Sequence, residues 1–228
     1  MLYAVLSAVL MLLVYLPSLW VRYVMHKYNK QLEQMPGTGG ELAEHLIERF
    51  ELADVEVEQT TEGADHYDPA AKMVRLSPSN FEGKSITAVA VAAHEVGHAI
   101  QFCRNETISQ LRSRYIPKAM MMKKIGILLL TLLPVAGFVI KSPVAIFALI
   151  GLSIALQLFG ALAYLIVLPE EWDASFNKAL PILKEGDYLP EQYQPGAHKV
   201  LKAAALTYFA GALADVVNIG RWLLVLRR

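Results

Sequence analysis

Two long runs of uncharged, mostly apolar residues constrain this chain more than any other feature of its sequence. The first run, residues 1–20, contains no Asp, Glu, Lys or Arg, and the second, residues 125–168, contains only Lys141. Because about 20 apolar residues cross the hydrocarbon core of a bilayer, the first run predicts one membrane span and the second predicts two. We place these two near residues 119–140 and 144–168. The sequence therefore predicts an integral membrane protein.

Basic residues flank both runs on the same expected side of the membrane. They follow the first run and precede the second: Arg22, Lys27 and Lys30, then Arg112, Arg114, Lys118, Lys123 and Lys124. Since basic flanks are retained in the cytoplasm, the chain between the runs is expected to be cytoplasmic. The first run is longer than the apolar part of a signal peptide and is read as a retained anchor. The zero net charge gives no case for a nucleic-acid partner.

The more polar segments predict a small soluble unit. Residues 41–52 carry apolar side chains at helical spacing, which predicts an amphipathic helix. Residues 55–58 and 73–77 read as two short strands that pair as a hairpin around a turn at residues 62–69. An edge strand of this kind suits the binding of an extended peptide by main-chain hydrogen bonds.

These segments give the expected domain organisation, a mainly α membrane fold with three to four transmembrane helices and a small α+β catalytic unit. The parts are an N-terminal anchor at residues 1–21, a cytoplasmic unit at residues 36–116 and 169–200, a two-span hairpin at residues 119–168, and a C-terminal apolar helix at residues 201–228. Asp215, Asn218 and Arg221 interrupt the last helix. Its pattern therefore fits a span, an interfacial helix or a helix packed on the catalytic site.

One pentapeptide, His94-Glu95-Val96-Gly97-His98, carries recognisable chemistry. It lies in an apolar, small-residue run at residues 85–102 that predicts a helix, and side chains four apart on a helix lie one above the other. Both imidazoles can then reach one metal ion while Glu95 lies beside it. This is the H-E-x-x-H pattern of zinc peptidases, in which the Glu is the general base. The alternative is a pair of core histidines that fall four apart by chance.

Two His side chains are an incomplete catalytic site, because zinc hydrolases of this kind use a third protein ligand. The histidine of the metzincin extension is absent, since Arg104 occupies its position. The remaining acidic cluster is Glu170, Glu171 and Asp173, which follows the two predicted spans. An even number of spans returns this cluster to the side of the pentapeptide. Pro169 followed by acidic residues predicts the start of a helix, and the alternative to a metal ligand is that these acidic residues only complement the dipole of that helix.

Five other residues are weaker candidates for a functional role. His66, Tyr67 and Asp68 lie in the predicted turn, whose chemistry accounts for Asp68 without any function. Tyr208 or His198 would provide a further hydrogen-bond donor to the reaction, although a Tyr on an apolar helix more often packs.

Several separate motifs together resemble the YugP-like family of bacterial membrane neutral zinc metallopeptidases. They fall in the same order and cover nearly the whole chain. The matching motifs are Asp65-His66-Tyr67-Asp68-Pro69, Val74-Arg75-Leu76-Ser77, the stretch around the pentapeptide up to Gln101, Leu168-Pro169 with Glu171, Asp173-Ala174-Ser175, and Ala203-Ala204-Ala205-Leu206-Thr207-Tyr208. The chain is also similar, more distantly, to the HtpX and CAAX-protease group of gluzincins.

The resemblance implies one zinc ion held by His94 and His98, with Glu95 as catalytic base. The similarity to the HtpX and CAAX-protease group implies Glu171 as the third zinc ligand, with Glu170 as the weaker candidate. Ser175 stands where that group has an Asp, and Asp173 is the substitute carboxylate that the sequence offers. The family also implies a multi-pass protein of a bacterial cell membrane.

The expected function is therefore a membrane-bound, zinc-dependent endopeptidase with its active site on the cytoplasmic side. Its expected partners are the lipid bilayer and a peptide or protein substrate that is itself membrane-associated. Two alternatives remain open at this point. One is a non-catalytic membrane scaffold with structural zinc, and the other is a zinc hydrolase that acts on a non-peptide amide or ester.

Overall fold

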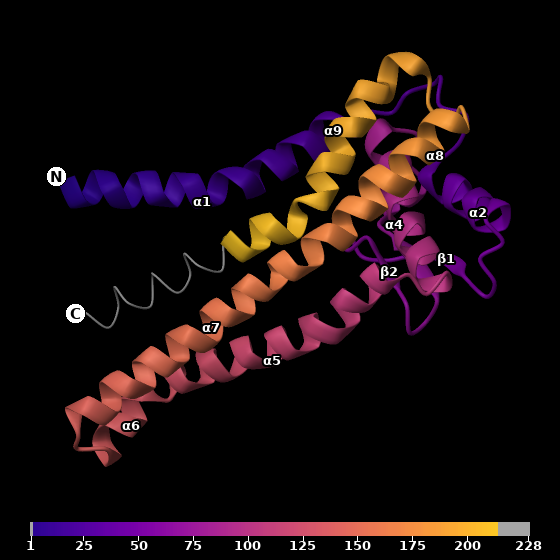
Figure 1. Cartoon of the computed structure of the whole chain (residues 1–228). Helices are drawn as coiled ribbons and strands as arrows, with labels where there is room; N and C mark the ends of the chain where they lie inside the picture. Colours follow the sequence, from indigo (N-terminus) through magenta and orange to yellow (C-terminus); the bar gives the residue numbers. More distant parts are fainter. Residues whose placement is uncertain (1, 214–228) are drawn as a thin grey trace. The chain divides into compact units, whose positions relative to one another are not determined.

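The computed structural model describes residues 2–213, which are mostly helical with one small sheet (Figure 1). The chain forms two compact units. The helical unit comprises Met1–Ser18, Leu111–Leu168 and Tyr208–Arg228, and the mixed unit comprises Leu19–Gln110 and Pro169–Thr207. Most of the predicted C-terminal helix, residues 214–228, lies outside the described residues.

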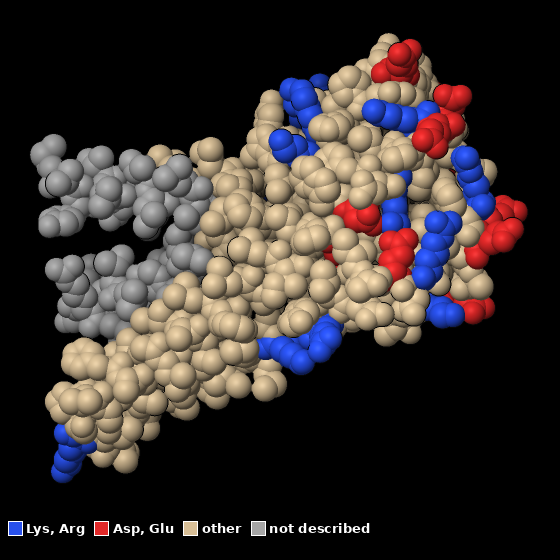
Figure 2. Space-filling model, viewed as in Figure 1, with Lys and Arg blue, Asp and Glu red and all other residues tan. Residues whose placement is uncertain are grey.

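The helical unit is built from long apolar helices. α5 (Gln110–Thr131) is followed by α6 (Leu133–Val139), and α7 (Pro143–Trp172) comes next. On the face seen in Figure 2, most of the surface of these helices carries no charged side chain, although α5 contains Arg112, Arg114, Lys118, Lys123 and Lys124. Phe138 and Phe147 are 86% and 73% exposed, which is unusual for large apolar side chains in contact with water.

Among the described residues, one or two helices are long and apolar enough to cross a membrane. The first is the helix from Pro143 to Glu185, with a mean hydropathy of 2.3 in its most apolar window, and the second is the bent pair α5 and α6. The first predicted span falls in α1 (Leu2–Lys27), whose side chains before residue 12 lie outside the described part. The expected total of three to four transmembrane helices therefore stays a prediction.

The predicted span at residues 119–140 is broken rather than straight. The two helices on either side of Leu132 meet at an angle of 53°. Pro134 lies in the first turn of α6 and has no N–H to donate to the carbonyl group of Leu130, so the helical hydrogen-bond ladder is interrupted there.

The mixed unit is organised around α4 (Ile86–Cys103), which carries the pentapeptide. Ser85 caps this helix by accepting a hydrogen bond from the Ala88 N–H. Every residue from Ile86 to Gln101 is buried, so the helix is covered on all sides. The elements that pack most extensively against it are α2 (Gly39–Arg49), the π-helix η2 (Asp173–Ala179) and α9 (Gln194–Ala205).

A three-stranded sheet lies beside α4 in the order β1–β3–β2. Its strands are β1 (Glu56–Gln59), β2 (His66–Asp68) and β3 (Met73–Leu76). Val74 and Leu76 are fully buried in the core of the unit. The remaining short elements are α3 (Pro78–Phe81), η1 (Thr107–Ser109), α8 (Leu180–Glu185) and η3 (Glu191–Tyr193).

The pairing of the predicted hairpin is wrong. β1 runs parallel to β3, whereas β2 is the antiparallel neighbour of β3, with Tyr67 opposite Val74. The physical reason is Tyr67, which is 3% exposed and packs against Phe102, so the predicted turn contains a strand with an inward-facing residue. The true hairpin turn follows Asp68, which accepts hydrogen bonds from the Ala70 and Ala71 N–H groups.

The predicted helix start at Pro169 is also wrong. α7 runs through Pro169 without interruption and passes into η2 at Asp173. Proline with acidic residues after it is typical of a helix N-terminus, but Glu170 and Glu171 are buried among side chains of α4 rather than exposed in a first turn. π-helical segments are rare, and they occur frequently at functional sites.

Gly97 allows α4 to approach η2 closely. A Cβ atom at this position would lie 2.8 Å from the backbone oxygen of Ala174. No rearrangement of a flexible side chain can relieve this contact, because the opposing atom belongs to the backbone.

We expect Gly97→Ala to lower the melting temperature. The helix propensity of Ala favours the variant by about 1 kcal/mol, but overpacking against a fixed backbone costs about 1–3 kcal/mol. Thermal melts in the presence of a chelator would measure the net effect on the fold alone. Gly151→Ala is the matched control, since a Cβ at that helical position meets no atom within 4 Å. An unchanged melting temperature in both variants would contradict this account of the contact.

Candidate metal centre

The two histidines of the pentapeptide project from adjacent turns of α4. Their ring centroids are 4.7 Å apart, and the rings lie nearly perpendicular to each other. His94 is 4% exposed and His98 is 1% exposed. This burial makes a solvated surface role impossible, so both imidazoles depend on partners inside the protein.

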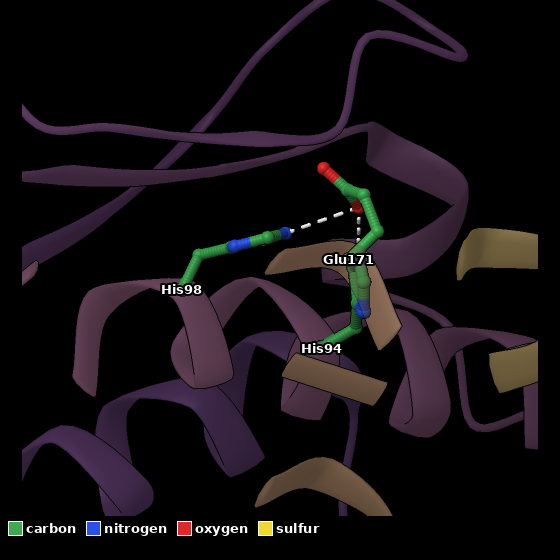
Figure 3. Close-up of side chains that lie close together, drawn as sticks. All are labelled: His94, His98 and Glu171. Atoms are coloured by element: carbon green, nitrogen blue, oxygen red, sulfur yellow. Dashed lines mark hydrogen bonds and ion pairs between the residues drawn. The ribbon is translucent and has the colours of Figure 1, made fainter. Parts of the chain in front are cut away.

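Glu171 meets both imidazoles from the last turn of α7. Its Oε2 atom lies 3.3 Å from Nε2 of His94 and 3.3 Å from Nε2 of His98. Figure 3 shows the two rings directed at the same carboxylate oxygen. Burial alone would raise the pKa of Glu171, which lies beyond the apolar stretch of α7, but the imidazoles of His98 and His94, in their protonated forms, hold this pKa below its ordinary value.

A serine fixes the tautomer of His94. The Ser175 hydroxyl lies 2.9 Å from Nδ1 of His94 and 3.1 Å from the backbone oxygen of Leu201. A carbonyl oxygen can only accept, so the hydroxyl donates its one proton to Leu201 and accepts from the Nδ1–H of His94. The Nε2 atom of His94 therefore carries a lone pair that faces Glu171.

A glutamine fixes the tautomer of His98 in the same way. The amide nitrogen of Gln101 donates to the backbone oxygen of Glu170 at 3.0 Å and to Asp173 at 2.8 Å. Its Oε1 atom is thereby turned toward Nδ1 of His98, at 3.0 Å, and accepts the Nδ1–H. In their neutral forms, which a metal requires, both imidazoles thus present unprotonated Nε2 atoms to one carboxylate.

This donor set fits zinc. Three lone-pair donors that converge in a buried space repel one another unless a cation lies between them. In a tetrahedral site with bonds of about 2.0–2.1 Å, neighbouring ligand atoms are about 3.3–3.4 Å apart, which is close to the observed distances from Glu171 to each imidazole. Among the described residues, His94, His98 and Glu171 form a group that could hold a metal ion, because their donor atoms lie within 4.8 Å of one another.

Glu170 lies on the other side of the His98 ring. Its Oε1 atom is 3.8 Å from Nδ1 of His98, whereas Glu171 faces Nε2 of the same ring. Glu170 is fully buried, and its backbone oxygen accepts the hydrogen bond from Gln101. Consecutive glutamates therefore contact opposite nitrogens of one imidazole.

Asp173 supports Gln101 rather than either histidine. Burial raises the pKa of Asp173, but donors from Lys178, Gln101 and Asn177 outweigh this effect and keep the pKa below its usual range. Lys178 also donates to Glu106 at 2.8 Å, which ties the segment after α4 to η2. The sequence offered Asp173 as the carboxylate in place of Ser175. Asp173 contacts Gln101, and Gln101 in turn contacts His98.

Glu95 differs from its neighbours because its carboxylate has no partner among residues 2–213. It is buried, with 7% of its surface exposed, and forms no hydrogen bond or ion pair within that part of the chain. The adjacent imidazoles are both anchored by two contacts each. Glu95 is therefore the acidic side chain of α4 that is available to an incoming molecule.

The weaker candidates lie elsewhere. His66 contacts the backbone oxygen of Ala64, and the backbone N–H of Ala71 and the guanidinium of Arg75 lower the pKa of Asp68. His198 is exposed on α9 with its ring 5.3 Å from Phe176, outside the histidine and glutamate cluster. Tyr208 belongs to the helical unit, where Arg112 donates a hydrogen bond to its hydroxyl.

Sequence reasoning missed the positions that hold the imidazoles in place. Gln101 and Ser175 were named there only as parts of matching motifs, and Ser175 also as a departure from an expected Asp. One signal was available for Gln101, since it lies three residues after His98 on the same helix and therefore on the same face. The signal for Ser175 needed the packing of η2 against α4, which the sequence does not give.

Comparison with known proteins identifies the family of the chain. A family model described as "Putative neutral zinc metallopeptidase" matches residues 3–227. The chain is 34% identical over 213 residues to a Bacillus subtilis (strain 168) protein named "Putative membrane protease YugP", and the match covers 91% of each chain. No solved structure matches the chain. Because the family model spans nearly the whole sequence, the chain belongs to this family of neutral zinc metallopeptidases.

Proposed function

We propose that the chain is a membrane-bound, zinc-dependent endopeptidase in which His94, His98 and Glu171 hold one zinc ion and Glu95 is the general base. The observation that carries the proposal is the convergence of two unprotonated Nε2 atoms and one carboxylate oxygen in a buried space. The name of the Bacillus subtilis relative, a membrane protease, supports peptide bonds as the target and a membrane as the setting.

The residues divide the chemistry between them. When bound, zinc supplies Lewis-acid polarisation of the scissile carbonyl and lowers the pKa of a water molecule to about 7. Glu95 would accept the proton of the attacking water and pass it to the leaving amine, a role that requires a carboxylate that is not already engaged. Ser175 and Gln101 keep the two imidazoles in the tautomer and orientation that zinc requires.

Glu171 is the better choice for the third ligand because of the side of His98 that it faces. The metal would lie where the Nε2 atoms of both rings point, so a third ligand must lie close to both of these atoms. The carboxylate of Glu171 does so. Glu170 faces Nδ1, which already donates its proton to Gln101. We therefore assign Glu170 to orientation of His98 and Glu171 to the metal.

A structural zinc site is the less favoured alternative. Structural zinc sites are closed by four protein ligands, whereas catalytic sites keep one position for water. The cluster in the described part of the chain has three donors, and the unengaged carboxylate of Glu95 adjoins it. This arrangement supports hydrolysis over a scaffold role.

The proposal predicts that Glu95 and Glu171 fail in different ways. Glu95→Gln should keep stoichiometric zinc and lose at least about 100-fold in the rate of casein cleavage, because the base is removed and the ligands remain. Glu171→Ala should lose zinc as severely as His98→Ala does. Zinc content by elemental analysis, measured beside chelator-sensitive cleavage, separates the two effects.

Glu170→Ala is the matched control for the neighbouring position. It should retain zinc more fully than Glu171→Ala, since it removes a side chain on the Nδ1 side of His98. Retained zinc in Glu171→Ala together with lost zinc in Glu170→Ala would move the ligand to Glu170. Joint loss of zinc and activity in Glu95→Gln would refute the role of Glu95 as base.

Ser175→Ala and Gln101→Ala should each weaken zinc binding by about 10–100-fold, the usual effect of removing a residue that orients a ligating imidazole. The measurement is a competition titration with a chromophoric chelator. Ser109→Ala is the control, because Ser109 is also buried but donates to the backbone of Glu106 away from the imidazoles. Wild-type affinity in both orienting variants would show that the rings are held by packing alone.

We place the active site on the cytoplasmic side and the loop between α6 and α7 outside. Cysteines introduced at Ser142 in this loop and at Thr61 in the mixed unit, both exposed, test this in a Cys103→Ala background. An impermeant maleimide added to intact cells should label Ser142→Cys and should label Thr61→Cys only after lysis. Labelling in the reverse order would overturn the orientation.

A further inference from the structure

A cavity of about 390 Å³ lies in the mixed unit, between the C-terminal end of α1 and the outer face of α9. It is separate from the metal centre, and none of the three clustered donor residues lines it. Its walls include Trp20, Tyr23 and Lys27 from α1, and His198, Lys199 and Lys202 from α9. We call it the basic cavity.

Helical spacing directs both sets of side chains into the basic cavity. Trp20, Tyr23 and Lys27 follow one another at intervals of three and four residues, so they share one face of α1. Lys199 and Lys202 are likewise three apart on α9, whose opposite face is buried in the core. Gly196 brings α9 close to α1, because a Cβ there would lie 3.0 Å from the ring of Tyr28.

The basic cavity has a strong excess of positive charge. Its lining contains three lysines and no carboxylate. Within residues 2–213, none of Lys27, Lys199 and Lys202 forms an ion pair, although this part of the chain has several lysine–carboxylate pairs elsewhere. The ammonium group of Lys27 instead lies 5.6 Å from the ring centroid of Tyr23 and 5.7 Å from that of Tyr28.

Three lysines that line one cavity and have no acidic partner within residues 2–213 favour the binding of an anion, and a cavity of this size admits a group larger than a single ion. We propose that the basic cavity binds the phosphate-bearing headgroup of an anionic phospholipid. The lysines would contact the phosphate, and the aromatic residues would lie at the level where headgroups meet acyl chains.

The position of the cavity along the chain favours a lipid over a free phosphate. Trp20 is the last residue of the uncharged run of 20 residues and Tyr23 follows it by three positions; they are 36% and 61% exposed. Exposed Trp and Tyr followed by Lys are typical of a membrane interface, where anionic lipids attract basic side chains. This step rests on the proposed membrane setting and not on the proposed peptidase chemistry.

The test is a titration of the full-length chain in neutral detergent with dioctanoylphosphatidylglycerol, followed by native mass spectrometry. A chelator is present throughout, so that neither zinc nor peptidase activity affects the result. We expect one saturable lipid per chain. Each lysine near anionic lipid contributes about five-fold in affinity, so the triple variant Lys27→Gln, Lys199→Gln and Lys202→Gln should bind about 100-fold more weakly.

The matched control is the triple variant Lys30→Gln, Lys84→Gln and Lys184→Gln. These lysines are also exposed and without ion pairs in the described part of the chain, but they do not line the cavity. The control should bind as the wild type does, and both triple variants should keep the wild-type melting temperature.

Three outcomes would overturn the proposal. Equal binding of dioctanoylphosphatidylcholine would remove the requirement for an anionic headgroup. Binding of inorganic phosphate as tight as that of the lipid would assign the cavity to a soluble phosphate. Equal losses in the two triple variants would show that attraction depends on total charge and not on the basic cavity.

Discussion

The complete burial of α4 is the constraint on which the rest of the mixed unit depends. A helix covered on every side cannot leave His94 or His98 to water, so their polar atoms must be satisfied by side chains from other elements. Four nitrogen atoms are involved, and each lies near a partner supplied by α7, by η2 or by α4 itself. The packing that buries α4 therefore also places the hydrogen-bond partners of its two histidines.

The end of α7 and the start of η2 match the spacing of α4. Glu171 and Ser175 are four residues apart, as His94 and His98 are, so each pair presents two side chains from one face of a helix. His94 is contacted by both members of the opposite pair, through its two ring nitrogens. Gly97 lies between the histidines and leaves room for the backbone of Ala174, without which these contacts could not form.

The sequence predicted those features that depend on a local residue pattern or on the number of expected membrane spans. Helical periodicity located the helix of the pentapeptide, and the even number of predicted spans pointed to the acidic cluster that contains Glu171. Features that depend on packing were not predicted. The segment around Tyr67 resembled a turn but forms a strand, because Tyr67 packs against Phe102. Pro169 resembled a helix start but lies inside α7, because the residues after it are buried against α4. Both patterns were ambiguous until the tertiary partner was known.

The continuity of α7 has a consequence for substrates in the proposed membrane setting. Glu171 follows Leu168, the last residue of the predicted span, by three positions on one uninterrupted helix. With a rise of 1.5 Å per residue, this places Glu171 about 5 Å along the helix axis beyond the apolar stretch. If the apolar stretch of α7 spans the bilayer with its C-terminal end in the cytoplasm, as proposed above, a metal held there would lie close to the cytoplasmic boundary. Peptide bonds near the membrane surface would then reach the site directly, which is why we propose substrates that are themselves membrane-associated.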